Sequence, residues 1–150
     1  MVISKTVVET YKELSQRPVN QFYKKHKQNV STCSKDIIII ARKLDDCRGN
    51  KITETVNIAG AALIRNMGSN EKPIYLFRSL FVGPVFRSNQ LGTLITAFAQ
   101  NILPKSPLYT LCENQLISFY KAQQFEVCLN TPNELAKLNA KKNLTLLVRL

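Results

Sequence analysis

The sequence is poor in the residues that build metal sites and disulfide scaffolds. It has one histidine, His26, and its cysteines form no Cys-X-X-Cys pair and have no neighbouring histidine. A zinc site needs several such ligands at short spacing, so we expect no metal cofactor. Reduced, structural thiols are the preferred interpretation of the four cysteines. They are Cys33, Cys47, Cys112 and Cys128.

Long apolar runs are also missing. The longest unbroken run covers residues 37–41, whereas a membrane-spanning helix needs about 20 apolar residues. The N-terminal segment carries no cleavable apolar region of the kind that an export signal requires. We therefore expect a cytoplasmic protein that does not bind a membrane.

Acidic residues are scarce: 10 of them face 21 lysines and arginines, which gives a net charge of +11. Such a balance suits either nucleic acid or an anionic small ligand. The basic residues are dispersed, and no arginine-rich stripe alternates with aromatic residues, which disfavours nucleic acid. The length of 150 residues, without repeats or a linker, predicts a single domain over residues 1–150.

Residues 73–103 organise the rest of the chain. Residues 74–82 alternate as a strand that is apolar on both faces, which predicts a place in the middle of a covered sheet. Leu76, Leu80 and Val82 share one predicted face with Ile74, and Tyr75, Phe77 and Phe81 share the other. An apolar helical stripe follows, formed by Leu91, Leu94, Ile95, Phe98, Ala99 and Ile102. Between them lies a polar turn carrying Arg87, where free N–H groups and a helix dipole would suit a phosphate.

The remaining periodicities predict two helices, then strands, then alternating strands and helices. Amphipathic helices are expected over residues 6–16, with Val7, Val8, Tyr11 and Leu14 inward, and over residues 18–27, with Val19, Phe22 and Tyr23 inward. Further expected elements are a strand at 36–43 buried on both faces, a turn at 45–50, a strand at 51–65 in which Gly60 marks a bulge or close approach, a strand at 108–112, a helix at 113–123, a strand at 125–129, a helix at 131–139 and a strand at 144–150. The predicted class is a mixed α/β (α+β) sandwich around one sheet.

This order of elements, together with two motifs, resembles the GNAT-type N-acetyltransferase fold. The family's acetyl-CoA motif is Arg or Gln, two residues, Gly, one residue, then Gly or Ala; Arg87 and Gly92 match it, and Gln90 replaces its first glycine. If that position needs a positive φ, Gln90 would weaken cofactor binding, and if it is helical the cost is small. A second region is similar at Tyr120 and Phe125, with Gln124 where glycine is usual. The resemblance implies a three-layer sandwich with a mostly antiparallel sheet of six or seven strands and about four helices.

The resemblance also implies a binding site for acetyl-CoA as the acyl donor. The backbone of Leu80, Phe81 and Val82 would bind the pantetheine arm like an added strand. Backbone amides would cradle the pyrophosphate, and the Arg87 side chain would add charge. The residues that would supply these amides are Arg87, Ser88, Asn89, Gln90, Leu91, Gly92 and Thr93.

Tyr120 is the candidate general acid, and core packing is the alternative for an aromatic residue on an inner helix face. The helix at 113–123 is expected to turn Leu116, Phe119 and Tyr120 inward, with Ile117 beside them. No general base is assigned, because Glu54, Glu113 and Glu126 are better explained as surface charges and a water chain could take the proton. His26 is expected to be solvated, and Cys112 lacks a histidine that would make it a nucleophile.

The predicted function is therefore an acetyl-CoA-dependent N-acetyltransferase acting directly on a primary amine, in a small molecule, a protein N-terminus or a lysine. Two alternatives stay open. One is a catalytically weak GNAT-like module that binds CoA or regulates, motivated by Gln90, Gln124 and the missing base. The other is a basic nucleic-acid-binding protein, supported only by charge. Pairing of two copies through the C-terminal strands also stays open.

Overall fold

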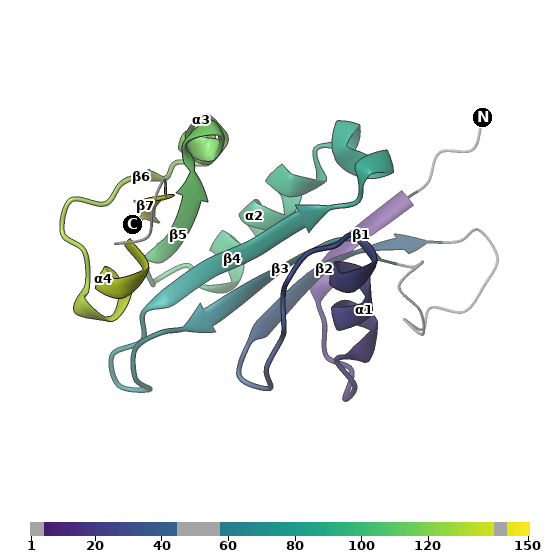
Figure 1. The fold of residues 1–150 in the computed structure, drawn as a ribbon, viewed down its shortest axis with the longest axis horizontal. Helices are drawn as coiled ribbons and strands as arrows, with labels where there is room; N and C mark the ends of the chain where they lie inside the picture. The colour runs from purple at the N-terminus through teal and green to yellow at the C-terminus, as the bar shows by residue number, and fades with distance from the viewer. Residues whose placement is uncertain (1–4, 45–57, 140–143) are drawn as a thin grey trace.

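The computed structural model describes residues 5–44, 58–139 and 144–150, which form one sheet with helices on both faces (Figure 1). Seven strands lie in the order β1-β2-β3-β4-β5-β7-β6, and the pair β4–β5 is parallel while the other pairs are antiparallel. The strands are β1 (Lys5–Thr10), β2 (Ile37–Leu44), β3 (Ile58–Asn66), β4 (Tyr75–Val82), β5 (Leu108–Glu113), β6 (Glu126–Val127) and β7 (Leu144–Arg149). The helices are α1 (Arg17–Lys25), α2 (Leu91–Ile102), α3 (Ile117–Ala122) and α4 (Asn133–Asn139), with 3₁₀ turns η2 (Pro84–Asn89) and η3 (Asn114–Leu116). The predicted mixed, mostly antiparallel sandwich is confirmed.

The helices make the sheet the middle of three layers. Figure 1 shows α1 in front of the sheet and α2 behind it. Leu91, Ile95 and Ala99 of α2 share one core with Tyr120 of α3, on the face to which Phe77 points. On the opposite face, α1 buries its own core residues and α4 packs through Leu135. None of the helices in the described ranges is long and apolar enough to cross a membrane.

The helix predicted over residues 6–16 is wrong, because Lys5–Thr10 form the edge strand β1. This segment is rich in β-branched residues, which fit a pleated strand better than a helix. Backbone pairing with β2, with Val8 opposite Ala41, supplies hydrogen bonds that a short isolated helix would have to provide alone. Tyr11 is buried as expected, whereas Leu14 is fully exposed.

The predicted helix at 18–27 and strand at 36–43 are confirmed as α1 and β2. α1 buries its apolar face, formed by Val19, Phe22 and Tyr23. β2 is buried on both faces: Ile39 packs toward α2, and Ile38 and Ile40 pack toward α1. The turn predicted at 45–50 and the first part of the strand predicted at 51–65 lie outside the described residues.

Gly60 in β3 meets both predictions made for it. The pairing with β2 shifts register between Ala41 and Arg42, so Ala59 is an extra residue in β3. A Cβ on Gly60 would lie 3.1 Å from Ile95 Cδ1 and 3.2 Å from the Phe81 carbonyl oxygen. Glycine therefore allows α2 to lie close to the sheet at this point.

The central strand β4 contains a second bulge, which corrects the predicted faces. Pairing with β3 passes from Arg78 opposite Leu63 to Phe81 opposite Ala61, so β4 has one residue more than β3 here. Ser79 takes up the extra residue with φ of 59°. Side chains beyond the bulge change face: Leu80 and Val82 pack beside Phe77 toward α2, whereas Phe81 packs toward α1. Leu80 and Leu76, which were predicted to share a face, are on opposite faces.

Helix α2 buries a different set of side chains from the predicted one, and helix α3 starts later than predicted. In α2, Leu94 is 50% exposed, and Thr96 is buried in its stead and donates from Oγ1 to the Gly92 carbonyl oxygen at 2.7 Å. The helix predicted from residue 113 begins only at Ile117, because Glu113 ends β5 and a 3₁₀ turn follows. Leu116 is consequently exposed rather than inward.

The C-terminal predictions are close to the structure. The strand predicted at 108–112 is β5. The strand predicted at 125–129 is reduced to β6, and α4 lies inside the predicted range 131–139. β7, predicted at 144–150, inserts between β5 and β6.

Ser79 is the residue whose backbone we expect to limit what can replace it. A β-branched side chain at φ near 59° is sterically disfavoured, so Ser79→Val should lower the free energy of unfolding by about 1–3 kcal/mol. Ser79→Gly should leave stability within about 1 kcal/mol of the wild type or raise it. Urea unfolding followed by circular dichroism measures both, with Ser79→Ala as the control for loss of the hydroxyl. Equal stabilities of the valine and glycine variants would contradict the strain at this position.

Candidate active site

The site begins where β4 and β5 part. They pair in parallel only from Tyr75–Leu108 to Phe77–Thr110, after which β5 continues its pairing with β7 alone. The Thr110 hydroxyl donates to the Phe77 carbonyl oxygen at 2.8 Å at this last contact. Beyond it, the edge of β4 that faces β5 has no strand partner within the described ranges. Such an edge offers backbone groups to an extended ligand.

The start of α2 lies beside this edge. No side chain of the described chain caps its N-terminus, and the first intrahelical bond runs from the Leu94 N–H to the Gln90 carbonyl oxygen at 3.1 Å. The amides of Leu91, Gly92 and Thr93 precede that bond, at the positive end of the helix dipole. They can donate hydrogen bonds to an anion.

The backbone of Gln90 shows whether the first glycine position of the motif needs a positive φ. Its φ of 58° and ψ of 27° are left-handed, so the position is one that favours glycine. Gln124, the other glutamine at a usual glycine position, has φ of 70°. The chain therefore adopts the backbone that glycine would take at both places, at a cost of about 1–3 kcal/mol each.

The free edge of β4 and the start of α2 line one groove of about 470 Å³, which we call the β4–α2 groove. Its wall residues from these elements are Leu80, Phe81, Val82, Arg87, Gln90, Gly92 and Thr93, and α3 with the turn before it adds Leu116, Phe119 and Tyr120. Most sequence-predicted binding residues thus meet in one place. Leu91 instead buries its side chain in the core. Ser88 and Asn89 lie in η2, and their side chains fall outside what the structure describes.

Arg87 folds back over the groove wall. Its Nε donates to the Val82 carbonyl oxygen at 3.1 Å, and its guanidinium lies 5.2 Å from the centre of the Phe81 ring. The side chain is exposed, so these contacts hold it weakly. Arg87 is one of the residues that line the groove.

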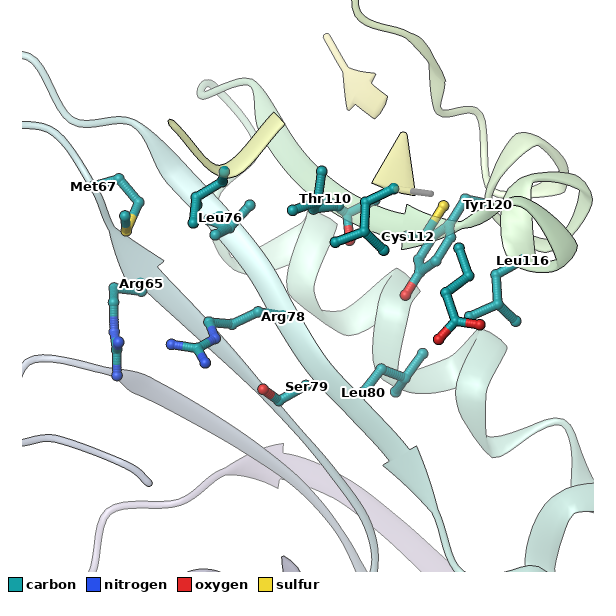
Figure 2. A pocket seen from close by; sticks show the side chains of 14 residues that line it. Arg65, Met67, Leu76, Arg78, Ser79, Leu80, Thr110, Cys112, Leu116 and Tyr120 are labelled. Atoms are coloured by element: carbon teal, nitrogen blue, oxygen red, sulfur yellow. The ribbon is translucent and has the colours of Figure 1, made fainter. Parts of the chain in front are cut away.

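A second cavity of about 440 Å³ adjoins the groove, and we call it the Arg78 pocket (Figure 2). It is lined by Arg65, Met67, Leu76, Arg78, Ser79, Leu80, Thr110, Leu111, Cys112, Glu113, Leu116, Tyr120, Leu138 and Leu144. Leu80, Leu116 and Tyr120 line both cavities. The two cavities therefore meet at these three side chains.

Tyr120 is both a core residue and a lining residue. It is 5% exposed, and the rings of Phe119 and Phe125 pack against it edge-on at 5.0 and 5.4 Å. Burial raises the pKa of its hydroxyl to about 12, against a smaller lowering effect of a hydrogen bond with Thr110. The hydroxyl is therefore fully protonated at neutral pH and can act as a hydrogen-bond donor where the cavities meet.

His26 is not the solvated side chain that was predicted. It is half-buried at the end of α1, with its ring 5.0 Å from that of Phe22 and 5.2 Å from that of Phe81. Burial is the main cause that lowers its pKa, and the charges of Lys25 and Arg87 add to the effect. The ring supports Phe81 from the side opposite the groove.

The sequence did not single out Arg78, Thr110 or Leu116 as site residues. Arg78 had a visible signal, as the one charged side chain in the strand predicted at 74–82. Glu113 lines the Arg78 pocket, whereas Glu126 does not line it and Glu54 lies outside the described residues. In the ranges that the structure describes, no three His, Cys, Asp or Glu side chains gather as metal ligands.

The fold matches solved structures of acetyltransferases. One is an acetyltransferase of the GNAT family from Staphylococcus aureus Mu50, with a TM-score of 0.62 and 13% identity over 97% of this chain and 98% of that one. The ribosomal-protein-S18-alanine N-acetyltransferase of Escherichia coli gives 0.65 and 9% over 97% and 93%. An aminoglycoside 6'-N-acetyltransferase complexed with coenzyme A gives 0.64 and 10% over 95% and 96%. No protein-family model and no curated protein matches the sequence. The chain has the GNAT-type N-acetyltransferase fold, as the motifs predicted.

Cys112 lines the Arg78 pocket, but its environment predicts an unreactive thiol. It is buried, and burial followed by the charge of Glu113 raises its pKa, so little thiolate forms at neutral pH. We expect iodoacetamide to alkylate it at least about tenfold more slowly than the exposed Cys33 in the native protein. Peptide mass spectrometry at successive times measures both rates, and denatured protein is the control in which they converge. Equal native rates would mean that Cys112 is reactive.

Proposed function

We propose that acetyl-CoA binds in the β4–α2 groove and that its acetyl group passes directly to a primary amine held in the Arg78 pocket. The observation that carries this proposal is that an unpaired strand edge and an uncapped helix N-terminus line the same groove. The GNAT-type fold supports it, because a protein with that fold was solved with coenzyme A. The acceptor is a small molecule, a protein N-terminus or a lysine.

The groove suits the two chemical parts of the donor. The pantetheine arm has amide groups, and the backbone of Leu80–Val82 is free to pair with them as a further strand would. The pyrophosphate would accept hydrogen bonds from the amides of Leu91–Thr93. Arg87 holds the Val82 carbonyl oxygen in the free protein, so binding would release that carbonyl for the arm and bring the guanidinium to a phosphate.

The transfer requires little covalent machinery from the protein. The amine nitrogen attacks the thioester carbonyl carbon, a C–N bond forms, and the C–S bond breaks with the electron pair leaving on sulfur. The Tyr120 hydroxyl gives its proton to the departing thiolate and regains one from solvent. The amine loses its proton to water. The Glu113 carboxylate lines this pocket and would accept the proton from that water.

Acetyl-CoA should stabilise the protein measurably. At about 100 times its dissociation constant, a ligand that binds only the folded state adds roughly 2.7 kcal/mol, which raises Tm by about 5–10 °C in a domain of this size. Differential scanning fluorimetry with acetyl-CoA measures the shift, and an equal concentration of ATP controls for simple phosphate binding to a basic protein. Absence of a shift at millimolar acetyl-CoA would remove the proposed function.

The catalytically weak module is the second candidate, and the two glutamines in left-handed conformation favour it. Both functions predict the thermal shift, so the release of free CoA thiol separates them. Thiol release that depends on an added amine identifies the enzyme. Binding of acetyl-CoA without thiol release across a broad amine panel identifies the module.

Replacing Tyr120 with phenylalanine tests its assigned role. Loss of a general acid lowers kcat by about 100-fold, while the dissociation constant of acetyl-CoA should stay within about twofold, because the ring still packs between Phe119 and Phe125. The acid is active when protonated and its pKa is raised to about 12, so kcat should not fall between pH 7 and pH 10. A descending limb near pH 10 in the wild type would mean that the acid has a pKa close to that of an ordinary tyrosine, and unchanged turnover of Tyr120→Phe would exclude Tyr120 as the acid.

A further inference from the structure

The Arg78 pocket contains two arginines, but only one is neutralised. Arg65 forms a bidentate pair with Asp36, with Nε–Oδ1 and Nη2–Oδ2 distances of 2.8 Å each. The Asp36 side chain has no exposed surface, and its Oδ2 also accepts a hydrogen bond from the Cys33 N–H at 2.9 Å. The Asp36 carboxylate therefore neutralises the charge of Arg65 and accepts two of the hydrogen bonds that its guanidinium can donate.

Arg78 is different, because no hydrogen bond or ion pair joins its guanidinium to another described residue. The side chain is half-buried in the pocket lining. The hydroxyl of Tyr23 donates its hydrogen bond to the Ser79 carbonyl oxygen and does not pair with Arg78. The guanidinium nitrogens of Arg78 are not among the buried unpaired side-chain atoms of the described residues, so its five N–H donors are open to solvent and to a ligand. The pocket thus presents an unpaired cation on one wall.

The opposite wall of the pocket is where the chemistry would take place. Figure 2 shows Arg65 and Arg78 on one side of the cavity and Tyr120 with Leu116 on the other. Leu80, which borders the β4–α2 groove, follows Arg78 in β4 after the bulge residue Ser79, so the arginine and the groove are separated along the strand. Much of the remaining lining is apolar, with Met67, Leu76 and Leu138 among its members.

We propose that the acceptor carries a carboxylate in addition to its amine, and that Arg78 binds this carboxylate. This inference rests on the proposed function, since it places the amine where the two cavities meet, and it names the substrate class of that same site. The apolar lining and the separation favour a molecule in which an apolar spacer lies between amine and carboxylate. A guanidinium fork matches a carboxylate in bidentate geometry. A phosphate dianion would call for a second free cation, and Arg65 is already paired.

The test compares two molecules that differ only in the charged group, ε-aminocaproate and its amide. Calorimetry in the presence of CoA should show the acid binding at least about tenfold more tightly than the amide. Arg78→Gln should remove this preference, and Arg78→Lys should keep part of it because the charge remains without the fork. In acetyl transfer, the same variants should raise KM for the acid more than they lower kcat. A series of ω-amino acids of increasing length then locates the best spacer.

The control variant is Arg17→Gln, which removes one exposed positive charge from α1, outside both cavities. It should retain the preference for the acid, which separates recognition by Arg78 from attraction by net charge. Equal binding of acid and amide by the wild type, or no binding of either, would overturn the inference. This result does not depend on whether the Arg78 variants fold. A preference that survives in Arg78→Gln would overturn it as well.

The outcomes also separate this inference from the proposed function. Acetyl transfer to amines with no preference for a carboxylate would keep the proposed function and reject the role of Arg78. Arg78-dependent binding of the acid without thiol release from acetyl-CoA would keep the carboxylate site and reject the acetyltransferase.

Discussion

The extra residue at Ser79 is the constraint on which both cavities depend. It reverses the alternation of β4, so that Arg78 points to the face covered by α1 and α4 while Leu80 points to the face covered by α2. Without it, Leu80 would share the face of Arg78, and the β4–α2 groove would lose part of its wall. Tyr23 stabilises this irregular backbone from α1 by donating to the Ser79 carbonyl oxygen at 2.8 Å, and its ring is completely buried. The α1 core thereby supports the site from the opposite side of the sheet.

The parting of β4 and β5 turns this local irregularity into a connected pair of cavities. Parallel pairing ends at Phe77, where Thr110 forms the last contact between the strands. Tyr120 fills the space beyond it from α3, held by Phe119 and Phe125. Tyr120 therefore belongs to the core and at the same time lines both the β4–α2 groove and the Arg78 pocket. This is why core packing and a role in the site, weighed as alternatives from the sequence, are compatible in the structure.

Elements with strong local patterns could be predicted from the sequence, and features set by pairing could not. β2 was identified from its unbroken β-branched run, which is typical of a strand buried on both faces, and α1 from an apolar stripe with helical period. β1 was mistaken for a helix because its stability comes from pairing with β2, whose paired residues run from Ile39 to Leu44. The β4 bulge was missed because a serine carries no signal for a positive φ, and every face assignment after it was inverted. The Arg78 pocket was missed for a related reason, since its lining residues come from β3, β4, β5, α3, α4 and β7, which are distant in the sequence.

The glutamines at the two usual glycine positions indicate what the motif demands of the chain. Gln90 and Gln124 both adopt left-handed backbone, so the demand is on the dihedral angles and can be met by a larger residue at a cost in folding free energy. The side chain of Gln124 offsets part of that cost, because its Oε1 accepts a hydrogen bond from Arg149 Nη2 at 3.2 Å. The side chain of Gln90 is exposed, lines the groove and leaves the amides that follow it uncapped. Because a phosphate would be bound there by backbone N–H groups, the departure from glycine changes the rim of the groove and leaves its hydrogen-bond donors in place.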